Sequence, residues 1–319
     1  MQAGTQKIVV LGTGGTIAGL AQGAAPGRYR AAQKPVDELL AGVVVPPGVT
    51  VQVEQVAQID SKDMDLAVWQ ALLKACRVHL AQADVQGLVI THGTDTLEET
   101  AWLLQALLAP RQSVVLTCAM RPADAPDADG PRNLADALAV AADPKAQGVL
   151  AVCAGRILGA QSVQKLHSSR LDAFGSGEAG DMGRVRQGQV QWLRACVVPA
   201  PLASVEAVLA ASALPRVEIV LSHAAASGAH LDALVDPDTA ARHGVAPVRG
   251  LVLAGTGGGT LHHEIEAAAR RAQAAGVRIV RTTRCADGWL QPRAGDEFPA
   301  LPLSPVKARL ALMLDLLGR

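Results

Sequence analysis

The sequence predicts an α/β protein: a larger N-terminal domain with a mostly parallel sheet flanked by helices, and a smaller C-terminal α/β domain. Two observations predict this class. Short apolar, β-rich runs alternate with longer stretches of helical periodicity, which is typical of parallel sheets. The chain has 319 residues, half of them hydrophobic, which is enough for two cores. We expect domains at 1–195 and 216–319, joined by a linker at 196–215.

The N-terminal series begins with the apolar run of 8–11 and continues strand by strand. In its first long helix, apolar side chains from Leu66 to Cys76 recur at helical spacing. Polar or glycine-rich residues separate the elements. The predicted strands are 8–11, 51–56, 87–91, 114–117 and 149–153, and the predicted helices are 66–81, 97–108 and 131–141.

A glycine- and charge-rich segment, 175–188, is predicted to interrupt this alternation, and "VVPAP" (197–201) indicates an extended linker. Alternation resumes at 214–224. It continues with strand 251–254, helix 261–275, strand 277–281 and a closing helix at 305–317. The segment "LVLAGTGGGTL" (251–261) resembles "VVLGTGGTIAG" (9–19), which indicates either related halves or, as we favour, the same solution to a strand-to-loop turn.

Charge and cysteine content exclude several classes of protein. Lys plus Arg equals Asp plus Glu at 29 each, so we expect neither a nucleic-acid nor a membrane partner. Five scattered cysteines form no CxxC pair, and His262-His263-Glu264 lacks HExxH spacing, so we expect no metal and no cofactor. The start of the chain has no secretory signal and no apolar run approaches a membrane span, which predicts a cytoplasmic protein.

The loop "GTGGTIAG" (12–19) follows the first strand and raises the question of phosphate binding. It has no lysine of the P-loop type. The dinucleotide pattern GxGxxG fits Gly12 and Gly14, but its third glycine falls on Ile17, which leaves that function a weaker alternative. The loop instead holds two hydroxyls, on Thr13 and Thr16, among residues too small to crowd them.

The segment "VITHGTDTLEETAWLL" (89–104) predicts a buried strand, a sharp turn at Gly93 and a helix. Thr96 and Glu99 have the spacing of a capping box, so the helix should begin there. Thr94 and Asp95 then lie at the carboxyl end of a strand, before a helix N-terminus. Open α/β sheets bind ligands at that edge, and helix amides favour anions.

A third polar segment, "QIDSKDMD" (58–65), also follows a predicted strand. Asp63 or Asp65 can cap the next helix, which leaves Ser61 and Lys62 free to face the same site. No GxSxG motif is present. Threonine can serve as a nucleophile, but its weak hydroxyl needs a nearby base. His92 is the only histidine nearby. A lysine or tyrosine could serve if the site shifts its pKa.

Together, "TGGTIAG" (13–19) and "HGTDTLEET" (92–100) closely resemble the two signature segments of the bacterial-type L-asparaginases, the asparaginase/glutaminase family. "AMRPADAPDADGPRNLADAL" (119–138) and "KARLAL" (307–312) are similar to that family as well. The resemblance runs nearly end to end. It implies an amidohydrolase that converts L-asparagine to L-aspartate and ammonia, with possible weaker activity on L-glutamine.

The resemblance also implies roles for particular residues. Thr16 matches the nucleophile, and Tyr29, the only tyrosine, matches the tyrosine of a mobile lid. Thr94, Asp95 and Lys165 match a second catalytic group, while Ser61 matches the serine that binds the substrate α-carboxylate. Asp95 would bind the α-ammonium. The lid would hinge on the glycines at 12, 14, 15, 19, 23 and 27.

In the implied chemistry, Thr16 attacks the carboxamide to give an acyl-enzyme and ammonia, and water then releases aspartate. Thr94 and a desolvated Lys165 would move protons or activate water. Backbone amides near Gly93 would hold the oxyanion. The sequence does not decide which threonine attacks first, and Thr16 is favoured.

The chain departs from the family at several positions. "DSKDM" (60–64) is closer to the "DSSDM" of cytosolic members than to the "GSQDM" of secreted ones. Lys62 either adds a cation beside the α-carboxylate or points to solvent, which we favour slightly. The C-terminal loop "GTGGGT" (255–260) lacks the family's asparagine. The glutamate lent by a neighbouring subunit has three candidates here: Asp287, Asp296 and Glu297.

Two other functions share these features. The amidase subunit of a tRNA-dependent amidotransferase carries the same signatures, but it would bring an extra N-terminal domain and an RNA-binding face. A catalytically silent ligand sensor would not need the intact set of catalytic types. The family assembles around shared sites, so we expect a homodimer or homotetramer.

Overall fold

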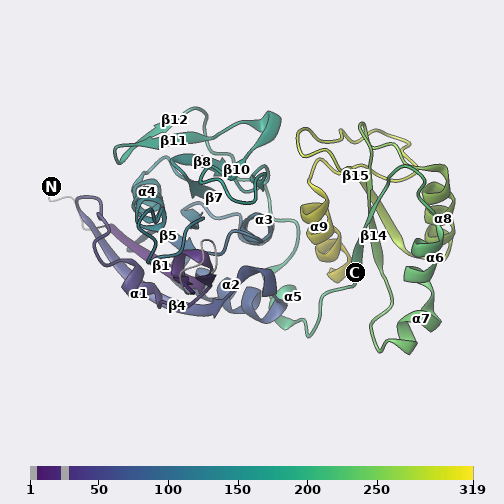
Figure 1. Ribbon diagram of the computed structural model, residues 1–319, viewed down its shortest axis with the longest axis horizontal. Helices are drawn as coiled ribbons and strands as arrows, with labels where there is room; N and C mark the ends of the chain where they lie inside the picture. Colours follow the sequence, from purple (N-terminus) through teal and green to yellow (C-terminus); the bar gives the residue numbers. More distant parts are fainter. Residues whose placement is uncertain (1–5, 23–28, 319) are drawn as a thin grey trace. The chain divides into compact units, whose positions relative to one another are not determined.

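The computed structural model describes residues 6–22 and 29–318 and divides the chain into two compact units, Met1–Pro201 and Leu202–Arg319. Figure 1 shows the N-terminal unit in purple to teal and the C-terminal unit in green to yellow. Each unit has its own sheet and its own buried core. The predicted fold class is confirmed: a larger, mostly parallel α/β unit and a smaller one.

The N-terminal unit is built on one eight-stranded sheet in the order β12-β11-β8-β7-β6-β5-β1-β4. The five neighbours from β7 to β4 are parallel, whereas β8, β11 and β12 continue the sheet in antiparallel fashion. The bounds are β1 Gln6–Gly14, β4 Val49–Ile59, β5 Val85–Thr91, β6 Ser113–Thr117, β7 Gly148–Cys153, β8 Arg156–Gly159, β11 Gly183–Arg186 and β12 Gln189–Trp192.

Helices cover both faces of this sheet (Figure 1). Helices α1 (Val36–Leu39) and α4 (Gly130–Ala142) share one core cluster with Ile8 and Val10 of β1. Helix α2 (Leu66–Leu80) contacts β1, β4 and β5, and α3 (Leu97–Leu108) contacts β7 and α2. Ile8, Val9, Val10 and Leu11 are therefore completely buried, as expected for a central parallel strand.

The predicted interruption of the strand–helix alternation at 175–188 is confirmed, because the described chain forms no α-helix between β7 and β12, and the segment lies inside the N-terminal unit. It contains the end of β10 (Phe174–Gly175) and the whole of β11, which extends the main sheet. In β11, Gly183 and Val185 are buried while Arg184 and Arg186 are exposed. A four-residue strand with only one buried face lacks an apolar run, which explains why its sequence resembles a loop.

The C-terminal unit has a three-stranded parallel sheet, β13-β14-β15, with bounds Val217–Leu221, Gly250–Gly255 and Arg278–Thr283. Helix α9 (Pro305–Leu317) contacts all three strands. Helices α6 (Ala229–Val235) and α8 (His263–Ala274) contribute to a core cluster with Leu251 and Leu253. Short helices α5 (Val205–Ala210) and α7 (Pro237–Arg242) complete the unit. None of the helices that the structure describes is long and apolar enough to cross a membrane.

Candidate active site

Three loops meet at the carboxyl ends of β4, β1 and β5, which are neighbours in the sheet. The loop after β1 carries Thr16, the loop after β4 carries Ser61, and the loop after β5 carries Thr94 and Asp95. The chain passes from β1 to β4 on one side and then to β5 on the other. Such a reversal of strand order is where open α/β sheets bind ligands.

Glycine residues allow these loops to approach one another closely. Gly15 has φ +82°, and a Cβ added there would overlap the Cα and N atoms of Gly93. A Cβ on Gly93 would in turn overlap the Ser61 hydroxyl. The glycines of the two signature segments therefore permit close approach of three loops, in addition to any role in a lid.

The first reactive pair is Thr16 with Tyr29. Thr16 begins a short 3₁₀ turn, η1 (Thr16–Ala18), and is only 5% exposed. Its Oγ1 lies 2.9 Å from the Tyr29 Oη, and either oxygen can be the donor. Tyr29 is placed by the pairing of β3 (Tyr29–Arg30) with β2 (Leu20–Ala21). Two glycines predicted to hinge the lid, at 23 and 27, lie outside the described residues.

The second reactive group is Thr94, Lys165 and Asp95. The Lys165 ammonium donates to Thr94 Oγ1 at 2.8 Å and to Asp95 Oδ1 at 2.6 Å. Lys165 lies on β9 (Gln164–Lys165), which pairs with β10, and its backbone N–H donates to Glu98 at 3.2 Å. Its side chain is 18% exposed, whereas that of Asp95 is half exposed. The amine is thus mostly withdrawn from water and held against a hydroxyl.

Ser61 joins the loop after β4 to the loop after β5 through hydrogen bonds. The backbone N–H of Asp95 donates to Ser61 Oγ at 3.2 Å, and the Thr96 hydroxyl donates to the Ser61 carbonyl at 2.7 Å. The predicted capping role of the Thr96 side chain is therefore wrong, although α3 does begin at Leu97. The hydroxyl bonds across to another loop because that loop offers a carbonyl at close range.

Lys62 turns towards carboxylates of its own loop. It forms ion pairs with Asp63 and, at 3.9 Å, with Asp60, and its side chain is 60% exposed. The hydrogen bond from Lys62 to Asp63 is the main reason why its pKa is raised. The ammonium is therefore paired with carboxylates near solvent, and a role of Lys62 beside the substrate α-carboxylate stays a prediction.

His92 is buried under the second signature segment. Its Nδ1 lies 2.8 Å from the Gly93 carbonyl, and burial lowers its pKa to about 4. A ring that stays neutral and bonds to the carbonyl of the next residue supports the turn. The bases that the structure does place beside hydroxyls are Tyr29 and Lys165.

The three acidic candidates in the C-terminal unit have different surroundings. Glu297 forms a two-pronged ion pair with Arg270 at 2.6 and 3.0 Å, and Asp296 lies 3.5 Å from Arg281. Asp287 is exposed. Which of them, if any, serves a neighbouring subunit stays a prediction.

Comparison with known proteins gives the family. Residues 7–197 match the family model described as asparaginase, N-terminal, and residues 216–318 match the glutaminase/asparaginase C-terminal domain. The chain belongs to the asparaginase family. This membership places it among the amidohydrolases.

Relatives of the asparaginase family match over almost the whole chain. The probable periplasmic L-asparaginase of Haemophilus influenzae and L-asparaginase 2 of Escherichia coli are each 34% identical, over 97% of this chain and 88% of the relative. The glutaminase-asparaginase of Pseudomonas aeruginosa is 35% identical over 95% and 84%. A crystal structure of a probable cytoplasmic L-asparaginase from Campylobacter jejuni superimposes with a TM-score of 0.86 at 33% identity, covering 98% and 96% of the two chains.

The sequence reasoning gave one residue near the site a different role and missed another. Thr96, which we expected to cap a helix, ties the Ser61 loop to the second signature segment, and Glu98, which we did not single out, holds the strand that carries Lys165. Both contacts join residues far apart in the chain, and no local motif marks them. The only signal was their presence within the "HGTDTLEET" segment.

Proposed function

We propose that this chain hydrolyses L-asparagine to L-aspartate and ammonia through a threonine nucleophile and an acyl-enzyme, with weaker activity on L-glutamine. The observation that carries the proposal is the pairing of two nearly buried threonine hydroxyls with a phenol and an amine, on loops in backbone contact. Each hydroxyl has the partner that a weak nucleophile requires.

In the first half-reaction, Thr16 Oγ1 attacks the carbon of the side-chain carboxamide. The Tyr29 oxygen accepts the hydroxyl proton of Thr16, with which it already shares a hydrogen bond, and gives its own proton to the carboxamide nitrogen. As the tetrahedral intermediate collapses, the C–N bond breaks and the nitrogen, now carrying that proton, leaves as ammonia. An ester to Thr16 remains. Backbone N–H groups near Gly93 and Thr94 would stabilise the negative oxygen.

In the second half-reaction, water replaces ammonia. The Thr94 hydroxyl and the Lys165 amine form the group that would accept the proton of the attacking water, once Lys165 is neutral. Hydroxide adds to the ester carbon and the bond to Thr16 breaks. Thr16 recovers its proton and aspartate leaves.

Residues at the ends of the same loops would bind and orient the substrate. The half-exposed Asp95 carboxylate would bind the α-ammonium, and Ser61, with the neighbouring amides, would bind the α-carboxylate. Lys62 stands at the edge of this group and would contribute long-range attraction at most. A single methylene separates asparagine from glutamine, worth roughly 1–3 kcal/mol in such sites, so some activity on both is expected.

We place the enzyme in the cytoplasm and expect a homodimer or homotetramer. The similar Campylobacter structure is of a probable cytoplasmic protein, and "DSKDM" resembles the cytosolic form of that motif, while the Haemophilus relative is periplasmic. Light scattering should give two or four times 32.8 kDa. A stable, fully active species of 32.8 kDa would contradict the assembly.

Ammonia release from L-asparagine, L-glutamine and D-asparagine, measured in parallel, tests the function. Thr16→Ala and Thr94→Ala should each lower kcat by at least about 10²–10⁴-fold, the usual worth of a positioned reactive group. Thr50→Ala, which removes an exposed hydroxyl on β4, is the matched control and should keep full turnover.

The outcomes separate the parts of the proposal. Near-full turnover by Thr16→Ala rules out its role as nucleophile. A folded wild-type protein that releases ammonia from none of the three amides rules out the activity itself.

A further inference from the structure

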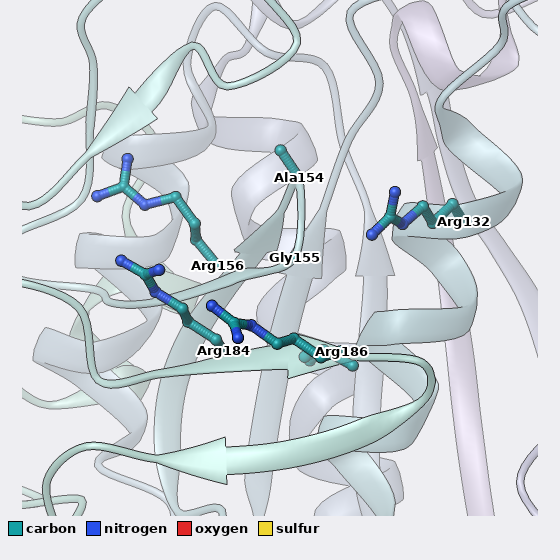
Figure 2. Close-up of a pocket in the computed structure, with 7 residues that line it drawn as sticks. Arg132, Ala154, Gly155, Arg156, Arg184 and Arg186 are labelled. Atoms are coloured by element: carbon teal, nitrogen blue, oxygen red, sulfur yellow. The ribbon is translucent and has the colours of Figure 1, made fainter.

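A second site, lined by arginines, lies on the N-terminal unit and shares no lining residue with the active site. Figure 2 shows this arginine pocket, a hollow of about 410 Å³ where the turn after β7, strand β11 and the start of α4 meet. Its lining residues are Arg132, Ala154, Gly155, Arg156, Arg184, Val185 and Arg186. The four arginines come from three separate parts of the chain.

Strand pairing brings these arginines together. Arg156 on β8 is directly opposite Arg184 on β11. Arg186 lies two residues after Arg184, so the alternation of the strand places it on the same face. A tight turn at Ala154 and Gly155, with φ +50° and +72°, connects β7 to β8. In Figure 2 the Arg132 side chain extends from α4 towards the arginines borne on the strands.

The carboxylates near the pocket do not balance its charge. Asp181 accepts two hydrogen bonds from Arg156, at 2.6 and 3.0 Å, and lies 3.8 Å from Arg184. Asp136 reaches Arg132 only at 4.0 Å. Arg186 has no ion-pair partner within the part of the chain that the structure describes. Four guanidinium groups thus share two carboxylates, which leaves at least two positive charges uncompensated.

Two features of this arrangement favour a bound anion. Arg156 and Arg184 are like charges directly opposite one another on paired strands, and they share the one carboxylate of Asp181, which offsets their repulsion only in part. A cation in the first turn of a helix, where Arg132 lies in α4, opposes the helix dipole. One anion in the pocket would remove both penalties.

We propose that the arginine pocket binds a phosphate group, either as inorganic phosphate or as the phosphate of a small organic ester. Guanidinium groups from three chain segments line the pocket, and a tetrahedral dianion has enough oxygens to contact more than one of them. A carboxylate has only two oxygens and one charge. Arg156 is already held by Asp181 and by the Phe174 carbonyl at 2.6 Å, so Arg132, Arg184 and Arg186 would supply most contacts.

Isothermal titration calorimetry with inorganic phosphate tests the site, at constant ionic strength set with chloride. Arg184→Gln and Arg186→Gln should each weaken binding by about tenfold or more, because a charged hydrogen bond is lost. Arg111→Gln makes the same charge change at an exposed arginine outside the pocket, and it should bind as the wild type does. Circular dichroism and melting curves verify that each variant folds.

Two further titrants identify the ligand. Tighter binding of glycerol 3-phosphate than of inorganic phosphate points to an organic ester, and equal or weaker binding points to free phosphate. The proposal is overturned if millimolar phosphate gives no saturable binding, if Arg111→Gln weakens binding as much as the pocket variants, or if succinate binds more tightly than either phosphate. None of these outcomes depends on amidase activity.

Discussion

At Gly15 the backbone approaches Gly93 so closely that a methyl group has no room. Gly15 also has φ +82° and ψ −170°, a conformation that is essentially limited to glycine and costs other residues about 1–3 kcal/mol. Gly42 provides a comparison, because it too has a positive φ, +78°, but nothing within 4 Å of an added Cβ. Both positions therefore disfavour a Cβ through their backbone conformation, and only Gly15 has the overlap as well.

We expect Gly15→Ala to destabilise the protein by more than about 3 kcal/mol and Gly42→Ala by about 1–2 kcal/mol. Part of the excess at Gly15 is the cost of separating the loops that carry Thr16 and Thr94, so on their proposed roles ammonia release should fall as well. Urea unfolding of both variants measures the difference. Equal losses would show that the loops can move apart freely.

His92 gives the N-terminal unit a dependence on pH. Burial lowers its pKa from an ordinary value of 6.5 to about 4, so the folded protein binds this proton less well than the unfolded chain. The stability that His92 contributes is complete above pH 6.5 and declines as the pH falls towards 4. The decline amounts to about 2 kcal/mol between pH 7 and pH 5.

Replacement by a residue that does not titrate should remove this decline. We expect His92→Gln to be less stable than the wild type at pH 7, yet to lose about 2 kcal/mol less on going to pH 5. Urea titrations at the two pH values, followed by tryptophan fluorescence, give the comparison. Parallel pH profiles for the two proteins would contradict the assignment.

At the scale of elements, the structure shows which residue caps helix α2, a point that the sequence left open. Both Asp63 and Asp65 were candidates for its cap. Asp65 takes the role, since its carboxylate accepts from the Val68 N–H at 2.9 Å. Asp63 instead lies in the preceding 3₁₀ turn, η2 (Ser61–Asp63), beside Lys62.

Asp65→Ala should therefore cost about 1 kcal/mol of unfolding free energy, the usual loss for a helix cap. Asp63→Ala removes only an exposed ion pair and should change stability by less than about 0.5 kcal/mol. Thermal and urea unfolding distinguish the two. A larger loss for Asp63→Ala would mean that the ion pair with Lys62 holds the Ser61 loop.

At the scale of the molecule, the elements with a strong periodic signal were predictable, and α3 and α9 match residue for residue. The antiparallel strands β8, β11 and β12 were not, because each has only four residues, too few for a clear periodic signal. Their pairing depends on contacts made only after the parallel sheet exists.

Some residues of the candidate site were predictable from the sequence, and some of its contacts were not. Thr16, Thr94 and Asp95 follow from signature segments, and the structure brings each to a partner. The bond from Thr96 to Ser61 and the gathering of arginines beside β11 depend on register between distant segments. The local sequence of each segment does not indicate how it pairs with a distant one.

The ion pair between Lys165 and Asp95 has a consequence for selectivity. In the free protein, one oxygen of the Asp95 carboxylate already has the Lys165 ammonium as its counter-ion. On the proposed role of Asp95, an arriving amino acid brings a second cation to the same carboxylate and loosens the hold on Lys165. A simple amide with no α-amino group brings none, and it would meet an amine still bound to its acid. Exchange of counter-ions would thereby link the release of Lys165 from Asp95 to the arrival of an amino acid.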